Sequence, residues 1–101
     1  KTESDGSTSF GTLTVASAAG DTIGNTKITI TESLTEGNSY KYKVDEAETQ
    51  VKLGQSVRTW QAWNGSDEIT AESGKVITIV ECNKSYDAVK AGHATVTSKT
   101  E

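Results

Sequence analysis

The feature that most constrains the fold of this chain is a series of short runs in which apolar and polar residues alternate. Residues 13–15, 28–30 and 40–44 each carry a large apolar side chain at every second position. A period of two places these side chains on one face of a β-strand and leaves the other face to water. Segments rich in Gly, Asn and Asp separate the runs and predict turns. The pattern therefore predicts half-buried strands joined by loops.

About seven short strands are expected, at the spacing that is typical of an all-β sandwich. The predicted fold is all-β: a single antiparallel β-sandwich of immunoglobulin or fibronectin type III kind, with a small barrel as the alternative. Residues 10–101 would form this one domain, because 101 residues is the length of one domain. Residues 1–9 are polar and lack periodicity, which predicts a flexible N-terminal leader or linker. Residues 45–58 are acid-rich and fit either a short helix or a long loop.

The most apolar run is 75–82, in which both sets of alternating side chains are largely apolar. Such a run predicts a central strand that is covered on both faces. The pattern does not assign which of the two faces points into the main core. Cys82 lies in this run. It is the single cysteine, so no internal disulfide can form, and burial predicts an inert thiol. The last strand or pair of strands is expected within 88–98, with a bulge at Gly92.

Composition argues against several classes of partner. The net charge is -4 and no basic cluster is visible, which argues against nucleic acid and against anionic membrane surfaces. No apolar run reaches the length of a membrane span, and the first ten residues lack the apolar region of a signal peptide. With few large aliphatic residues, the tryptophans and tyrosines should supply much of the core.

The two tryptophans, Trp60 and Trp63, could form a sugar-stacking platform or contribute to the core. Positions 60 and 63 of one strand point to opposite faces, so we expect at least one tryptophan to be core. If only one is exposed, Trp63 is the better candidate because it adjoins the Asn64-Gly65 turn. The candidate ligand-binding residues are Trp63, Asn64, Asp67 and Tyr40. A type I′ hairpin turn at Asn64-Gly65 with solvated acids is the simpler explanation of the loop.

No catalytic or metal site is predicted. His93 is the only imidazole, and a triad with Ser85 and Asp87 lacks any motif that would position a nucleophile or an oxyanion hole. We therefore expect a chain that is not an enzyme and needs no cofactor. One cysteine and one histidine are too few for structural zinc. A calcium site shared by loops 19–25 and 64–68 is the remaining metal alternative, although neither loop has calcium-loop spacing.

Three segments carry a resemblance to a known family: "GNSYKYK" (37–43), "AWNGSDEITA" (62–71) and "KAGHATVTSK" (90–99). Over roughly residues 11–99 the chain resembles a small immunoglobulin-like accessory domain of phage and prophage virion proteins from Gram-positive, Clostridium-like bacteria. The resemblance implies a virion-associated, non-enzymatic module, such as a head or tail decoration or appendage. Such a module would stabilise the particle or give weak surface adhesion. Its partners would be other virion proteins of the capsid or tail, copies of itself, or surface glycans.

Two alternatives place the chain on a bacterial surface instead of a phage particle. One is a carbohydrate-binding module of a secreted or cell-surface protein, with Trp63 and nearby tyrosines as the sugar contacts. The other is an immunoglobulin-like spacer in a cell-surface protein, which predicts a longer parent chain with tandem copies. In both cases the location would be extracellular.

Overall fold

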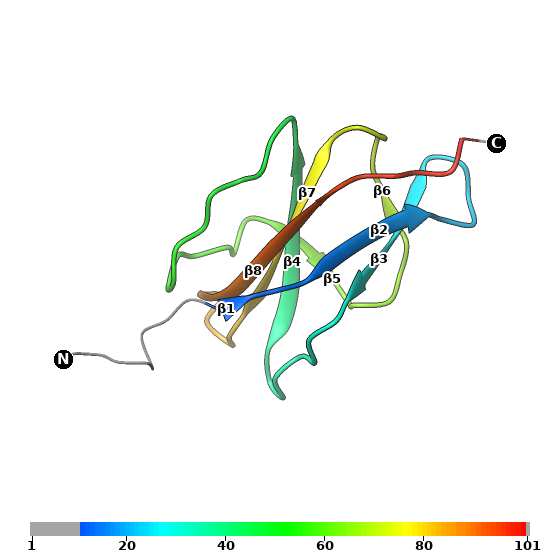
Figure 1. Cartoon of the computed structure of the whole chain (residues 1–101). Helices are drawn as coiled ribbons and strands as arrows, with labels where there is room; N and C mark the ends of the chain where they lie inside the picture. Colours follow the sequence, from blue (N-terminus) through cyan, green and yellow to red (C-terminus); the bar gives the residue numbers. More distant parts are fainter. Residues whose placement is uncertain (1–10, 101) are drawn as a thin grey trace.

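Two β-sheets packed face to face form the described part of the protein, residues 11–100 of a computed structural model (Figure 1). The five-stranded sheet has the order β1-β8-β7-β4-β5, and the three-stranded sheet has the order β2-β3-β6. The strands are β1 (Gly11–Thr12), β2 (Val15–Ala19), β3 (Asn25–Ile30), β4 (Ser39–Asp45), β5 (Gln61–Trp63), β6 (Ile69–Thr70), β7 (Val76–Cys82) and β8 (Ala88–Thr95). The predicted all-β sandwich is confirmed, with eight short strands. The predicted leader, residues 1–9, lies outside the described residues.

Strand order matches an immunoglobulin-type sandwich. Strands β8, β7, β4 and β5 occupy the places of strands G, F, C and C′, and they face β2, β3 and β6 in the places of A, B and E. One pair departs from the predicted antiparallel arrangement, because β1 runs parallel to β8 with Gly11 opposite Lys90 and Thr12 opposite Ala91. The first and last described strands are therefore neighbours.

The main core lies between the two sheets and confirms the faces that the alternation predicts. Ile77 and Ile79 of β7 point into it, which settles the inward face of this strand. Its other buried members come from both sheets and from segments next to the strands: Leu13, Ile28, Tyr40, Trp63, Ile69, Ala71 and Val96. The partly buried side chains of Val15, Ile30, Tyr42 and Val44 extend this core.

Residues 46–60 form the long loop that the sequence allowed, and no helix is found there. The loop covers the outer face of the five-stranded sheet, where Val57 is buried against Val80 and Cys82. Val51 and Trp60 pack against this second cluster. Strand β7 is thus covered on both faces, as predicted, and the thiol of Cys82 is buried.

Gly92 has a different role from the predicted bulge. The register irregularity between β7 and β8 falls at Glu81 and Cys82. At Gly92, the carbonyl oxygen of Leu13 lies where a Cβ atom would be, so only glycine fits without a shift of the backbone. Gly92 therefore allows the segment that joins β1 and β2 to lie directly on β8.

The described chain starts at β1 and ends beyond β8 at the opposite end of the sandwich (Figure 1). Between residues 11 and 100 the structure contains no helix long and apolar enough to cross a membrane.

Candidate functional site

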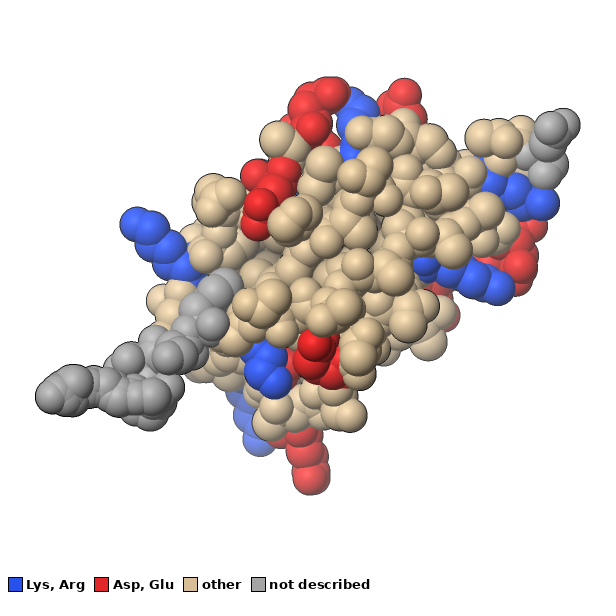
Figure 2. Space-filling model, viewed as in Figure 1, with Lys and Arg blue, Asp and Glu red and all other residues tan. Residues whose placement is uncertain are grey.

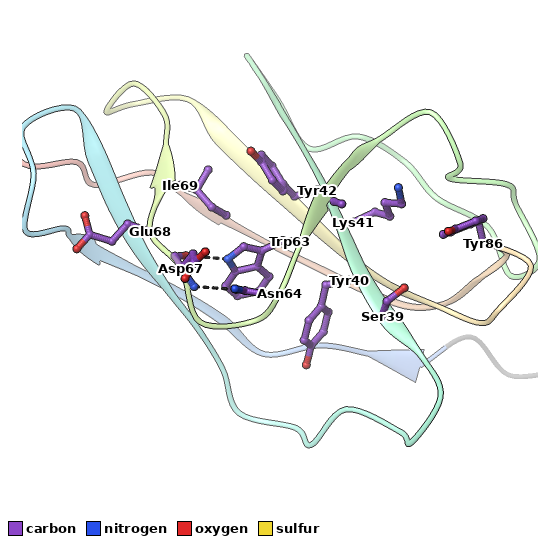
Figure 3. A pocket seen from close by; sticks show the side chains of 11 residues that line it. Ser39, Tyr40, Lys41, Tyr42, Trp63, Asn64, Asp67, Glu68, Ile69 and Tyr86 are labelled. Carbon is purple, nitrogen blue, oxygen red and sulfur yellow. Dashed lines mark hydrogen bonds between the residues drawn. The ribbon is translucent and has the colours of Figure 1, made fainter.

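An open groove of about 600 Å³ runs along the β4–β5 edge of the larger sheet and the turn that follows β5 (Figure 3). We call it the Trp63 groove. Its lining residues come from β4, β5, the turn, the start of β6 and the β7–β8 turn: Ser39, Tyr40, Lys41, Tyr42, Ala62, Trp63, Asn64, Asp67, Glu68, Ile69 and Tyr86. All four residues that the sequence suggested for ligand binding therefore lie in one place.

Tyr40 and Trp63 form the inner wall of the groove. They are opposite each other in the β4–β5 pair, and their ring centroids are 5.3 Å apart with planes tilted by 43°. The two side chains are only 6% and 7% exposed, because both belong to the main core. Burial raises the pKa of the Tyr40 hydroxyl, and the negative charges of Glu81 and Glu32 raise it further. The hydroxyl of Tyr40 is therefore a neutral group at physiological pH.

The expectation that Trp63 would be the exposed tryptophan is wrong. Trp63 is buried, and its Nε1 donates a hydrogen bond of 2.7 Å to the carbonyl of Asp67 (Figure 3). Trp60 is the more exposed of the two; it is the last residue of the 46–60 loop and packs against the second cluster, on the opposite face of the sheet. The faces of the two residues were predicted correctly. Proximity to the turn misled the choice between them, because the turn folds back over Trp63.

The Asn64-Gly65 turn is not a hairpin, because β5 and β6 belong to different sheets. Asn64 Oδ1 accepts hydrogen bonds from the backbone N–H groups of Ser66 and Asp67, both at 2.9 Å. Gly65 has φ of 90°, whereas Asn64 does not have positive φ, so the turn is not type I′. A Cβ at Gly65 would lie 3.2 Å from the ring of Tyr40. The turn thus carries the chain from one sheet to the other and closes the groove at that end.

The rim of the groove offers hydrogen-bonding groups to a ligand, whereas the aromatic rings of its inner wall form no exposed platform. Asn64 and Asp67 are exposed at the turn, and Lys41 and Tyr42 are half-buried along β4. The rings of Tyr40 and Trp63 present little area to solvent, so a sugar ring cannot stack between two exposed tryptophans. Polar recognition at the rim, with Asp67 as the exposed carboxylate, is what this arrangement can provide chemically.

The residues considered for a catalytic triad are not assembled. His93 lies near the far end of β8, where its Nδ1 is 3.2 Å from a carboxylate oxygen of Glu48. Ser85 lies in the β7–β8 turn, and its backbone N–H donates to Asn83. The strand β8 therefore separates the histidine from the serine.

The two loops considered for calcium do meet, but through N–H groups that donate hydrogen bonds to the carboxylate of Glu68. The carboxylate of Glu68 accepts hydrogen bonds from the backbone N–H groups of Asp21 and Thr22 and from the side-chain amide of Asn25. Both of its oxygens are used by N–H donors, and within residues 11–100 no group of three or more His, Cys, Asp or Glu side chains converges. Glu68 fastens the β2–β3 loop to β6.

Sequence reasoning missed a buried carboxylate at Glu81. Its side chain is fully buried, and Oε2 accepts hydrogen bonds from the Thr35 N–H at 3.2 Å and the Asn38 amide at 2.8 Å. Oε1 has no hydrogen-bond partner among the described residues and lies 3.9 Å from Lys90 Nζ. The signal was present, because Glu81 shares the inward face of β7 with Ile77 and Ile79. A buried carboxylate at this position holds the β3–β4 loop against the sheet.

Comparison with known proteins gives a family match and two similar solved structures. The family described as "S-layer protein SbsC C-terminal domain" matches residues 18–99. The crystal structure of S-layer protein SbsC domains 7, 8 and 9 is 24% identical, with a TM-score of 0.65, over 86% of this chain and 29% of that chain. The structure of SbsC domains 4–9 is also 24% identical, with a TM-score of 0.61, over 87% of this chain and 14% of that chain. No curated protein matches the chain.

Proposed function

Since the chain belongs to the S-layer protein SbsC C-terminal domain family, we propose that it is a non-enzymatic structural domain of a bacterial cell-surface protein. The observation that carries the proposal is the extent of the family match. Residues 18–99 include the last two residues of β2 and all of the strands from β3 to β8. The match therefore covers most of the sandwich and not a single motif.

The lengths of the similar structures favour one unit of a longer array. The chain spans 29% of a three-domain piece of SbsC and 14% of a six-domain piece. At 24% identity these structures support the fold alone, and the array is our proposal for this chain. Its partners would be neighbouring domains of the same polypeptide, other copies of the chain, or other components of the surface.

A phage particle is the other location that the sequence suggested. The matching family and both similar structures are of S-layer proteins, and nothing in them indicates a phage origin. We therefore favour the cell surface over the virion. A structural role without catalysis is common to both readings.

Surface shaving tests the location directly. Intact cells of the source bacterium are treated briefly with trypsin, and the released peptides are identified by mass spectrometry. Residues 59–75, "TWQAWNGSDEITAESGK", give a tryptic peptide that contains both tryptophans. We expect this peptide in the fraction shaved from cells, with a cytosolic enzyme as the control for lysis. Its absence from that fraction, with recovery from purified phage particles, would contradict the proposal.

Glycan binding at the Trp63 groove is a second candidate, favoured by the convergence of Tyr40, Trp63, Asn64 and Asp67 on one groove. A Trp60→Phe variant leaves Trp63 as the sole tryptophan, so its fluorescence reports this groove alone. Purified cell-wall polysaccharide should shift the emission, and adding Asp67→Asn should weaken the shift. Glu36→Gln, at an exposed acid outside the groove, is the matched control. An unchanged emission at saturating polysaccharide argues against this candidate.

A further inference from the structure

We propose that this domain is built to bear tension along its length, with the β1–β8 pair and the contacts that continue it acting as a shear clamp. The inference rests on the proposed function and deepens it, because a domain within a surface array receives force through its two chain ends.

The two terminal segments run side by side in the same direction for most of the length of the sandwich (Figure 1). After the β1–β8 pair, the Leu13 N–H donates to the Ala91 carbonyl at 2.9 Å. Farther along, the Thr97 N–H donates to Ser17 Oγ at 2.8 Å. Near the end of the described chain, Lys99 forms a parallel bridge with the β2–β3 loop, and its carbonyl accepts a bond from the N–H of Gly24. The connections thus extend from one end of the domain to the other.

The direction in which the two chain ends are pulled determines how force acts on these hydrogen bonds. The described chain enters at the β1 end and leaves beyond β8 at the opposite end, so tension pulls the two segments past each other along their length. In this geometry the hydrogen bonds that lie across the direction of pull share the load. A force applied at one end of the pair would instead open the bonds one after another. Resistance to tension should therefore be greatest along the axis that joins the chain ends.

Packing around the clamp supports the same role. Gly92 lets the backbone at Leu13 lie directly on β8, and a Cβ at Gly11 would come within 2.6 Å of the side chain of Lys90. Lys90 therefore covers β1, while its Nζ reaches toward the buried carboxylate of Glu81 at 3.9 Å. The face that contains β1, β2 and β8 is mostly uncharged, with charged side chains gathered around its rim (Figure 2). The clamp thus combines close backbone packing with one anchored side chain.

Single-molecule force spectroscopy on the whole 101-residue chain tests the proposal by comparing two pulling directions. In the first, handles are attached at the two chain ends. In the second, one handle is at the N-terminal end and the other at Ser85→Cys, an exposed position in the β7–β8 turn. This turn is at the same end of the sandwich as β1, so the second geometry peels β1 from β8. Cys82 is fully buried, and a chain without the substitution serves as the labelling control.

We expect a rupture force several-fold higher when the chain ends are pulled than when the pair is peeled. The two measurements use the same fold, and forced unfolding follows the unfolding barrier instead of equilibrium stability. Equal forces, or a lower force between the chain ends, would overturn the inference while leaving a surface location intact. The surface-shaving experiment tests the location separately from the force measurement. If it shows that the domain is not on the cell surface, no surface array would apply tension to the domain, whatever rupture forces are measured.

A pair of variants locates the resistance within the domain. Gly92→Ala disturbs the clamp, whereas Ile69→Val shortens a buried side chain in the three-stranded sheet. Pulled by the chain ends, Gly92→Ala should rupture at a clearly lower force than the unsubstituted chain, and Ile69→Val should change the force little. The reverse order would place the mechanical barrier outside the β1–β8 pair and would overturn the inference.

Discussion

Replacement of Trp63 by alanine should cost far more stability than the same change at Trp60. The Trp63 side chain is 7% exposed, lies against Tyr40 at 5.3 Å between ring centroids and donates its indole N–H to Asp67. Loss of a buried tryptophan costs about 3–5 kcal/mol, because transfer and cavity terms add. Trp60 ends the 46–60 loop, packs against the second cluster and keeps contact with water, so we expect a loss of about 1–2 kcal/mol from the smaller area that it buries.

Urea unfolding followed by far-ultraviolet circular dichroism measures both losses without relying on the altered fluorophores. With a denaturant slope of about 1.5 kcal/mol/M, Trp63→Ala should lower the midpoint by roughly 2–3 M and Trp60→Ala by roughly 1 M. Trp63→Phe keeps most of the ring and removes the hydrogen bond, so its loss of stability should fall between the losses for Trp60→Ala and Trp63→Ala. A loss under about 1 kcal/mol for Trp63→Ala, or a larger loss for Trp60→Ala, would refute our assignment of the core.

Three further perturbations test other parts of the structure. Glu81→Ala should cost about 1–3 kcal/mol, because it leaves the N–H of Thr35 and the half-buried amide of Asn38 without their acceptor; Glu36→Ala, at an exposed acid of the same loop, should change the free energy of unfolding by no more than about 0.5 kcal/mol. Gly92→Ala should cost about 1–3 kcal/mol through its clash with the Leu13 carbonyl, and an unchanged melting temperature would show that the two segments are not in contact. The backbone N–H and the hydroxyl of Thr14 donate hydrogen bonds to the carboxylate of Glu32 and lower its pKa below the ordinary 4.5. The ionised carboxylate therefore stabilises the fold above pH 4.5, and this stabilisation is lost as the pH falls through the lowered pKa. The difference in urea midpoint between the original chain and Glu32→Gln should accordingly shrink between about pH 5 and pH 3, and a difference that stays constant over this range would contradict the assigned hydrogen bonds.

Alternation predicted the fold because one face of nearly every strand is buried in a single core. Leu13, Ile28 and Tyr40 all face inward as their spacing requires. The run 75–82 was likewise recognisable as a covered central strand from its two apolar faces. Periodicity reports burial directly, so it predicts both the fold class and the faces of the strands.

Contacts that depend on long-range placement were not predictable in the same way. Asn64-Gly65 has the composition of a hairpin turn, but the chain uses it to cross between sheets, and local residue preference does not tell the two apart. The burial of Trp63 depends on that crossing. The parallel β1–β8 pair joins residues from near the two ends of the chain, where no local pattern specifies the partner.

The same β1–β8 pair also fixes when the fold can be completed during synthesis. β1 is the first strand of the sandwich to leave the ribosome, whereas its partner strand β8 is the last. Pairings between residues so distant in sequence are slow to form, because a long loop must close first. Until β8 arrives, β1 has no neighbour in its sheet and one edge of β7 is open to other chains. A nascent chain that stops before β8 therefore has an incomplete sheet, and the sandwich closes only once β8 has been made.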